Sequence, residues 1–156
     1  GIEKHLQYFI DNHDDYNKIM LQAISDRLAE SFAELLHHTM RTSLWCYVPD
    51  EQLTKDDLIH EKYIGIRPAP GYPACPEHTE KLKLFQLLNA TENTGIILTE
   101  HMAMYPAASV CGWYFSHPGS KYFGVGKISE EQMKDYTKRK AWSEEEAVKW
   151  LRPMLD

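Results

Sequence analysis

The chain has 156 residues, a length typical of one domain that buries about 70% of its unfolded surface. Hydrophobic residues make up 43% and charged residues 26%, both ordinary for a soluble globular protein, and the formal net charge is -6 with no basic cluster. These values argue against a nucleic-acid partner, since phosphate binding depends on a basic surface, and no apolar run is long enough to span a membrane.

The first third of the chain is predicted to form one long helix over residues 14–44, because apolar residues recur at helical spacing. Asp14 and Asp15 suit the start of this helix and Arg41 suits its end, as the helix dipole favours. An apolar stripe of this kind typically faces a core. The stripe comprises Met20, Ile24, Leu28, Phe32, Leu35 and Leu36.

Two shorter helices are expected next. Thr54 begins the first, which has Asp57 at the capping-box position and runs to about Tyr63. The second spans residues 77–89 and is followed by a turn at residues 91–95.

The pattern then changes to short β-branched or aromatic runs bounded by Pro, Gly and Ser, which is typical of strands. A turn at residues 117–120 is expected to join the last two runs as a hairpin. Capping boxes at 129–132 and 143–146 begin two closing helices. Helices, then antiparallel strands, then helices indicate an α+β fold in which helices pack on a sheet. The expected strands are 96–98, 102–105, 109–115 and 122–128.

A proline-rich loop, RPAPGYPACP, begins at Arg67. Proline fixes φ and lacks an N–H, so neither a helix nor a central strand can run through this loop. Pro68 biases the backbone of Arg67 toward an extended conformation, and a guanidinium on a stiff support suits a carboxylate or phosphate ligand. The alternative is a structural arginine that pairs with Glu61 or Glu30.

Other candidate residues carry weaker signals. Tyr72 stands in a turn that displays its ring, although packing beneath the loop is the commoner explanation. Aromatic residues and glycines alternate over residues 121–126, and a strand glycine often marks close approach by a ligand or another backbone. No nucleophile–base arrangement is legible, so no catalytic residue is predicted.

The cysteines and histidines are scattered. Cys46, Cys75 and Cys111 have no ligand spacing, and adjacent His37 and His38 point apart on a helix, so neither a metal site nor a disulfide framework is predicted. Free thiols suit a reducing compartment, which favours a cytoplasmic location.

Several segments carry a specific family pattern. They are DDYNKIM (14–20), DRLAESFAE (26–34), GIRPAPGYPACPEHTEK (65–81) and CGWYFSHPGSKYFGVGKI (111–128). Together they closely resemble the C-terminal activation domain of cobalamin-dependent methionine synthase. The family's domain is much longer, so residues 1–156 are expected to be an activation domain without its amino-terminal part, and Gly1 in place of a methionine also suggests a fragment.

The resemblance implies a helmet-shaped α+β fold around a twisted antiparallel sheet, and binding of S-adenosylmethionine. It also implies docking over the enzyme's cobalamin domain, where the sulfonium methyl and an electron from flavodoxin or an equivalent reductase convert cob(II)alamin to methylcobalamin. The cofactors supply this chemistry and the protein supplies positioning, so the chain is part of an enzyme but is not expected to be catalytic alone.

The resemblance also assigns roles to residues of the proline-rich loop and of the last expected strand. Arg67 matches the arginine that holds the methionyl carboxylate. Tyr122 and Phe123 match the strand that meets the adenosyl part, where Gly124 stands in place of a common alanine.

Three further residues match family positions around the ligand. Glu30 and Glu61 match glutamates near the amino and sulfonium end, and Tyr72 matches a tyrosine that faces the ligand or the corrin. A family aspartate of this site would lie in the missing amino-terminal part. The alternative function is therefore a docking module that contacts the cobalamin and reductase domains without binding S-adenosylmethionine by itself, while a free-standing methyltransferase or hydrolase has little support.

Overall fold

The protein is described by a computed structural model of residues 1–155. Its mixture of helices and a small antiparallel sheet confirms the predicted α+β class. The helices are α1 (Glu3–Asp11), α2 (Asp15–Thr39), α3 (Lys55–Ile59), α4 (Glu80–Leu88), α5 (Ala90–Thr94), α6 (Glu130–Lys140) and α7 (Glu144–Leu151), and the strands are β1 (Ile97–Leu98) and β2 (Met104–Tyr105).

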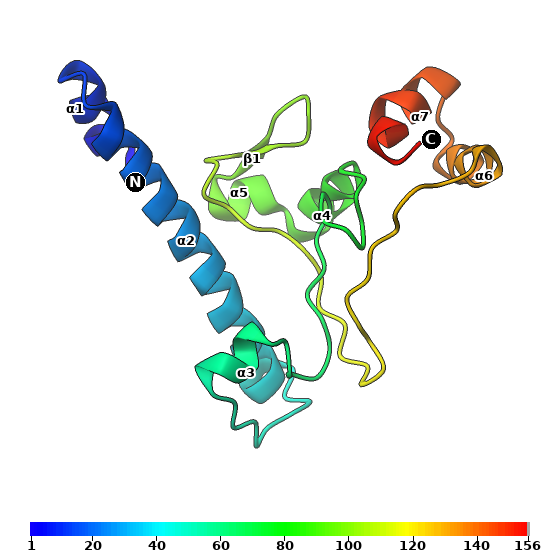
Figure 1. The fold of residues 1–156 in the computed structure, drawn as a ribbon, viewed down its shortest axis with the longest axis horizontal. Coiled ribbons are helices and arrows are strands. Elements are labelled where there is room, and N and C mark those ends of the chain that lie inside the picture. Colours follow the sequence, from blue (N-terminus) through cyan, green and yellow to red (C-terminus); the bar gives the residue numbers. More distant parts are fainter. Residues whose placement is uncertain (156) are drawn as a thin grey trace.

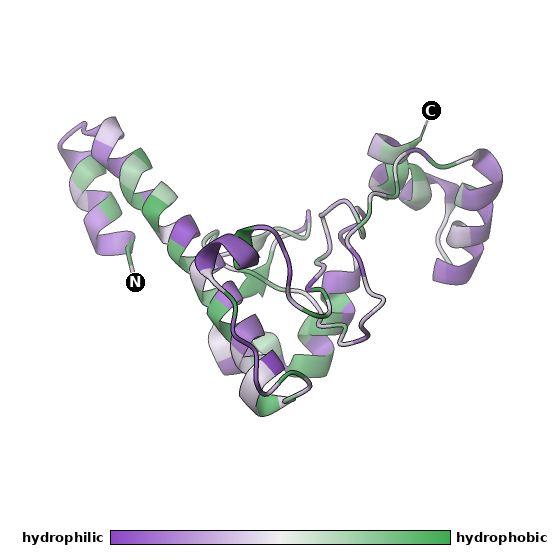
Figure 2. Cartoon of the chain, turned by 60° about the horizontal axis from the view of Figure 1, so that its bottom comes forward, coloured by the Kyte–Doolittle hydropathy of each residue, from purple (hydrophilic) through white to green (hydrophobic). Residues whose placement is uncertain are grey.

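The elements form three regions (Figure 1). The α1 and α2 helices make a long rod, α4, α5 and the two strands lie in the middle, and α6 and α7 form a separate C-terminal lobe. The helices pack mainly against their chain neighbours, α1 on α2, α4 on α5 and α6 on α7. Seen from another side, the chain makes a broad V with its two termini on opposite arms (Figure 2).

The long helix is confirmed. Asp14 caps α2 by accepting a hydrogen bond from the Asn17 backbone N–H at 3.0 Å, and a π-helical turn over Met40–Leu44 continues the helix to the predicted end. The α1 helix was not predicted, and residues 91–95, expected to be a turn, largely belong to the short helix α5. The α3 helix has the expected Thr54 capping box but ends at Ile59, four residues earlier than expected.

The apolar stripe of α2 does not face a core in this structure. Its six side chains are 37% to 65% exposed, and Figure 2 shows hydrophobic segments along the free length of α2. The solvent-accessible surface of the chain is 11291 Å², whereas a compact protein of 18.2 kDa exposes about 8,100 Å². The chain therefore buries about 57% of its unfolded surface, and the expectation of about 70% is wrong.

The sheet is smaller than the sequence predicts. Ile97 pairs with Tyr105 and Leu98 with Met104, so the first two expected strands are confirmed in shortened form. The expected strands at 109–115 and 122–128 do not form ladders. They run instead beside the proline-rich loop, whose prolines have no N–H to donate, so only scattered hydrogen bonds are possible there. The turn at residues 117–120 is present, closed by a bond from Ser120 N–H to the His117 carbonyl at 2.9 Å.

The C-terminal lobe holds a cluster of buried hydrophobic residues. Both predicted capping boxes form, with Ser129 at the start of α6 and Ser143 at the start of α7. Ala147, Leu151 and Met154 are buried between the two helices, against partly buried apolar neighbours. Local sequence signals are sufficient to specify this lobe, because its elements are adjacent in the chain.

Candidate functional site

The proline-rich loop is fixed by backbone hydrogen bonds to the segment that follows β2. The Pro68 carbonyl accepts from Trp113 N–H and the Pro73 carbonyl accepts from Val125 N–H, each at 3.0 Å. Gly65 precedes the loop with φ of +86°, and a side chain there would meet the Phe115 carbonyl oxygen at 2.3 Å. Only glycine permits this approach, which lets Ile66 pair with Phe115 and fixes the entrance to the loop.

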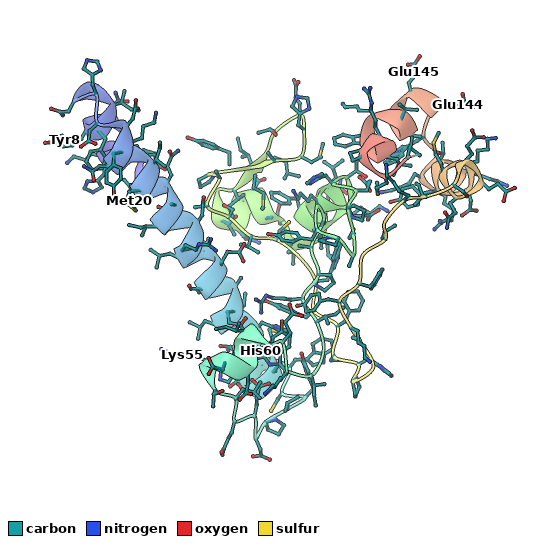
Figure 3. All side chains as sticks on the ribbon, in the orientation of Figure 1. Tyr8, Met20, Lys55, His60, Glu144 and Glu145 are labelled. Carbon is teal, nitrogen blue, oxygen red and sulfur yellow. The ribbon has the colours of Figure 1, made fainter. Side chains whose placement is uncertain are left out.

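A hollow of about 400 Å³ lies at the mouth of the loop, between α2 and α3. Two of the predicted site residues, Arg67 and Glu61, line it. Figure 3 shows α3, marked by the labels Lys55 and His60, across the lower end of α2. The lining residues are Glu34, Lys55, Leu58, Ile59, Glu61, Tyr63 and Arg67.

Arg67 is held by backbone and side-chain contacts. Its backbone N–H donates to Tyr122 Oη at 2.9 Å, and Nη1 donates to Glu34 Oε2 at 2.6 Å. The structural partner expected for Arg67 was Glu61 or Glu30, so that expectation is wrong: Glu34, one turn further along α2 than Glu30, faces the guanidinium. Burial opposes the charge of Arg67, but the hydrogen bond to Glu34 and the negative charge of Glu34 together outweigh it and raise the arginine's pKa.

A buried ion pair lies behind Arg67. Arg41, which is fully buried, donates from Nε to Glu51 Oε2 at 2.6 Å and from Nη2 to Glu51 Oε1 at 2.8 Å. Burial opposes ionisation of Glu51, but hydrogen bonds from Arg41 and His38 prevail and lower its pKa. This bidentate geometry is the strongest form of an Arg–carboxylate pair.

His37 fills the space between the two arginines. Its ring stacks on Tyr114 at 5.1 Å, meets Tyr63 edge-on at 4.9 Å, and is fully buried. Burial, reinforced by the positive charges of Arg41 and Arg67, lowers the pKa of His37 to about 3, so the ring is neutral at neutral pH. Its neighbour His38 instead contacts Glu51 at 3.0 Å, so the two adjacent histidines have different roles.

The other predicted residues surround the same loop. Tyr122 lies behind Arg67 and meets Tyr63, with 3.1 Å between the two hydroxyl oxygens. Tyr72 Oη approaches Glu30 Oε1 at 3.4 Å, long for such a bond, and burial and the Glu30 charge raise the pKa of Tyr72. Gly124 lies beside Pro73, its nearest neighbour at 3.9 Å from an added Cβ.

Phe123, between Tyr122 and Gly124 in the chain, is 60% exposed. Glu61 is also exposed, but its backbone is distinctive, with φ of 53° just after the end of α3. Glycine or asparagine usually occupies this left-handed position after a helix.

Sequence reasoning missed the side chains that contact Arg67 and the buried ion pair behind them. These are Glu34, His37, Arg41, Glu51 and Tyr63. One signal was available: Glu34, His37 and Arg41 recur every three or four residues on α2 and so share one face of the helix.

Among residues 1–155, no group of three or more His, Cys, Asp or Glu side chains is arranged to hold a metal ion. Within the same range, none of the helices combines the length and apolar character that crossing a membrane requires.

The fold and the site define an α+β module whose hollow offers a fixed guanidinium and nearby carboxylates. A family model described as "Vitamin B12 dependent methionine synthase, activation domain" matches residues 1–141. The chain belongs to this family of methionine synthase activation domains. It is also similar to a solved structure described as the "MetH Reactivation Domain bound to AdoHcy", with a TM-score of 0.93 and 54% sequence identity. The match covers 98% of this chain and 47% of that chain, so this chain spans about half the length of its relative.

Proposed function

We propose that the chain is the S-adenosylmethionine-binding activation module of a cobalamin-dependent methionine synthase, and that the hollow beside Arg67 receives the ligand's amino-acid end. The observation that carries the proposal is Arg67 itself, anchored by Tyr122 and Glu34 at the edge of a hollow that Glu61 also lines. A guanidinium and a carboxylate together match the two charges of an amino-acid zwitterion. Arg67 would pair with the ligand's carboxylate, and Glu61 would face its ammonium or sulfonium group. The similar structure carries AdoHcy, which differs from S-adenosylmethionine by the sulfonium methyl.

Tyr72, Glu30, Tyr122, Phe123 and Gly124 complete the proposed site. Exposed Tyr72 and Phe123 offer aromatic surface on the rim of the loop, available to the adenosyl group or to the corrin. The chemistry belongs to the bound cofactors, S-adenosylmethionine here and cobalamin on a separate domain, while this chain binds and orients. The proposed partners are that cobalamin domain and a flavodoxin-like reductase, and the proposed location is the cytoplasm.

We also propose that residues 1–156 are one part of the activation domain and that the remaining part covers the apolar stripe of α2. The chain exposes about 3,000 Å² more than a compact protein of its mass, an area of the size that permanent interfaces bury. A shallow apolar hollow of about 300 Å³ opens on the stripe, with Met20, Ile24 and Leu28 in its lining. The proposed occupant is the part of the domain that this chain, at about half the relative's length, does not include, which the family resemblance predicts to be amino-terminal.

A second candidate function, a docking module that binds no S-adenosylmethionine alone, is favoured by the same exposed stripe. The two functions separate by isothermal titration calorimetry of AdoHcy into residues 1–156 and into a chain that includes the remaining part of the domain. Binding of AdoHcy to the longer chain supports the activation module. If residues 1–156 alone do not bind AdoHcy, the remaining part of the domain supplies part of the site. Failure of both chains to bind AdoHcy would leave only the docking function.

The residue test uses Arg67→Ala and Arg67→Lys in the longer chain, with Arg139→Ala as the matched control. We expect Arg67→Ala to weaken AdoHcy binding by about 2–3 kcal/mol, the usual value of hydrogen bonds to charged groups. Arg67→Lys should also weaken binding, because a lysine keeps the charge but loses the fork. Arg139 lies in an exposed pair with Asp135 on α6, over the Tyr136 ring, so its loss should leave affinity unchanged. Unchanged affinity in Arg67→Ala would end the assignment.

A further inference from the structure

Four charged side chains alternate in sign from the interior to the hollow. Glu51 pairs with Arg41 at 2.6 Å, Arg41 Nη2 lies 3.9 Å from Glu34 Oε1, and Glu34 Oε2 accepts from Arg67 Nη1 at 2.6 Å. The Glu51 and Arg41 side chains are 4% and 0% exposed, whereas those of Glu34 and Arg67 are 26% and 27% exposed. The series ends in a positive charge at the hollow, so an anionic ligand would continue the alternation.

The contacts of Arg67 fall on one side of its guanidinium. Glu34 and His37 both contact Nη1, the latter through Nδ1 at 3.3 Å, where a neutral imidazole accepts the hydrogen bond. In residues 1–155, no hydrogen bond reaches Nε or Nη2 of Arg67. Nε and Nη2 form one edge of the guanidinium, and two parallel N–H groups on one edge are what a carboxylate needs for bidentate pairing.

Glu34 is itself tightly constrained. Its Oε1 atom is buried without a hydrogen-bond partner among residues 1–155. The residue lies on α2, with this oxygen 3.9 Å from Nη2 of the buried Arg41. Such a carboxylate cannot easily turn away from Arg67, because its only strong hydrogen bond would be lost.

We propose that Glu34 is a positioning residue for ligand binding, which holds Nη1 of Arg67 so that the Nε–Nη2 edge faces the hollow and pairs with the carboxylate of the ligand. This inference rests on the proposed function, and it adds a residue that the ligand itself does not touch.

A purely electrostatic role for Glu34 predicts the opposite effect of its removal. Loss of a negative charge next to Arg67 makes the hollow more positive, and a carboxylate ligand would then bind more tightly. Loss of positioning lets the guanidinium rotate and adds an ordering cost to binding, so the ligand binds more weakly. The sign of the change therefore separates the two roles.

The experiment measures AdoHcy affinity by calorimetry in the domain with its remaining part present. Glu34→Ala should weaken binding about tenfold, and Glu34→Gln, which keeps an acceptor oxygen at the same reach, should recover most of the loss. 5′-Methylthioadenosine has no carboxylate, so its affinity should not change in either variant. Asp26→Ala is the matched control, an exposed acidic residue two turns earlier on α2.

The outcomes are distinct. Equal or tighter AdoHcy binding in Glu34→Ala would overturn the positioning role while leaving the proposed function intact. No AdoHcy binding by the unsubstituted domain would overturn the proposed function and this inference with it. If Glu34→Ala does not fold, Glu34→Asp carries the same test, because it keeps the charge and withdraws the oxygens by one methylene. Weaker binding in Glu34→Asp supports positioning, and unchanged or tighter binding contradicts it.

Discussion

The two halves of α2 differ in what they expose and what they bury. The first half exposes apolar side chains such as Ile24 at 49% and Leu28 at 65%, and only α1 packs near its end (Figure 1). The end of α2 and the π-helical turn that continues it bury His37 and Arg41 completely, and Arg41 pairs there with Glu51. A stand-alone globular protein shows the reverse pattern, with apolar side chains inside and charges outside. The contrast fits the proposal that a partner surface covers the apolar half, whereas the charged half already pairs with Glu51 and with Arg67, the proposed ligand contact.

The largest expected effect tests the charged half. Arg41→Met removes the guanidinium of a buried pair and leaves the Glu51 carboxylate with its contact to His38 but without its buried counter-charge, so the free energy of unfolding should fall by about 3–5 kcal/mol. Urea unfolding measures this change. Arg139→Ala, in an exposed pair, should change the stability by less than about 1 kcal/mol. A loss of similar size in both variants would contradict the contrast between buried and exposed charges.

The sequence predicts those features of the fold that depend on residues close together in the chain. The α6–α7 lobe and the length of α2 were predictable, because capping boxes and helical periodicity are local signals. The strands at 109–115 and 122–128 were predicted wrongly. Their alternating aromatic residues are a local signal, but both segments lie beside the proline-rich loop, which is distant in the chain and lacks the N–H groups that a ladder needs.

The candidate site divides in the same way. Arg67 was identifiable from the proline that follows it, and the family resemblance supplied six further residues. The partner Glu34, however, lies 33 residues away in the chain, and Glu51 lies 10 residues from Arg41. No periodicity connects such pairs, so only the folded structure could identify the charge series that ends at Arg67.

The second prediction tests the apolar half. Leu28→Ala should leave the stability of residues 1–156 within about 0.5 kcal/mol, because the side chain is already in solvent. In a chain that includes the remaining part of the domain, the same change should cost about 2–3 kcal/mol, as for a buried leucine. Thermal or urea unfolding of both chains measures the difference. Equal, small changes in both would show that the stripe stays uncovered.

The third prediction uses the acid dependence of the charged half. The pKa of His37 falls from 6.5 to about 3 on folding, so the unfolded chain binds more protons between these values and stability is lost as the pH falls from about 6.5. One such group contributes a slope of at most about 1.4 kcal/mol per pH unit. His37→Phe keeps a buried ring and removes the titration, so the slope between pH 6.5 and 4.5 should flatten. Below pH 4.5 the lowered pKa of Glu51 adds a further loss in both proteins.

The smallest expected effect concerns the stability role of Arg67. Its pair with Glu34 is partly exposed, at 27% and 26% of the two side chains, so Arg67→Ala should lower the free energy of unfolding by no more than about 1 kcal/mol. Differential scanning calorimetry without ligand measures this change. A loss as large as that of Arg41→Met would make Arg67 a structural residue and would weaken the distinction between the buried end and the ligand end of the charge series.

The most direct measurement is a crystal structure of the domain, with its remaining part present, in complex with AdoHcy. The account predicts the ligand carboxylate on the Nε–Nη2 edge of Arg67, with Glu34 still on Nη1 and Glu61 near the amino group. It also predicts that the remaining part of the domain lies over Ile24 and Leu28. A ligand bound away from Arg67, or a carboxylate that displaces Glu34 from Nη1, would contradict it.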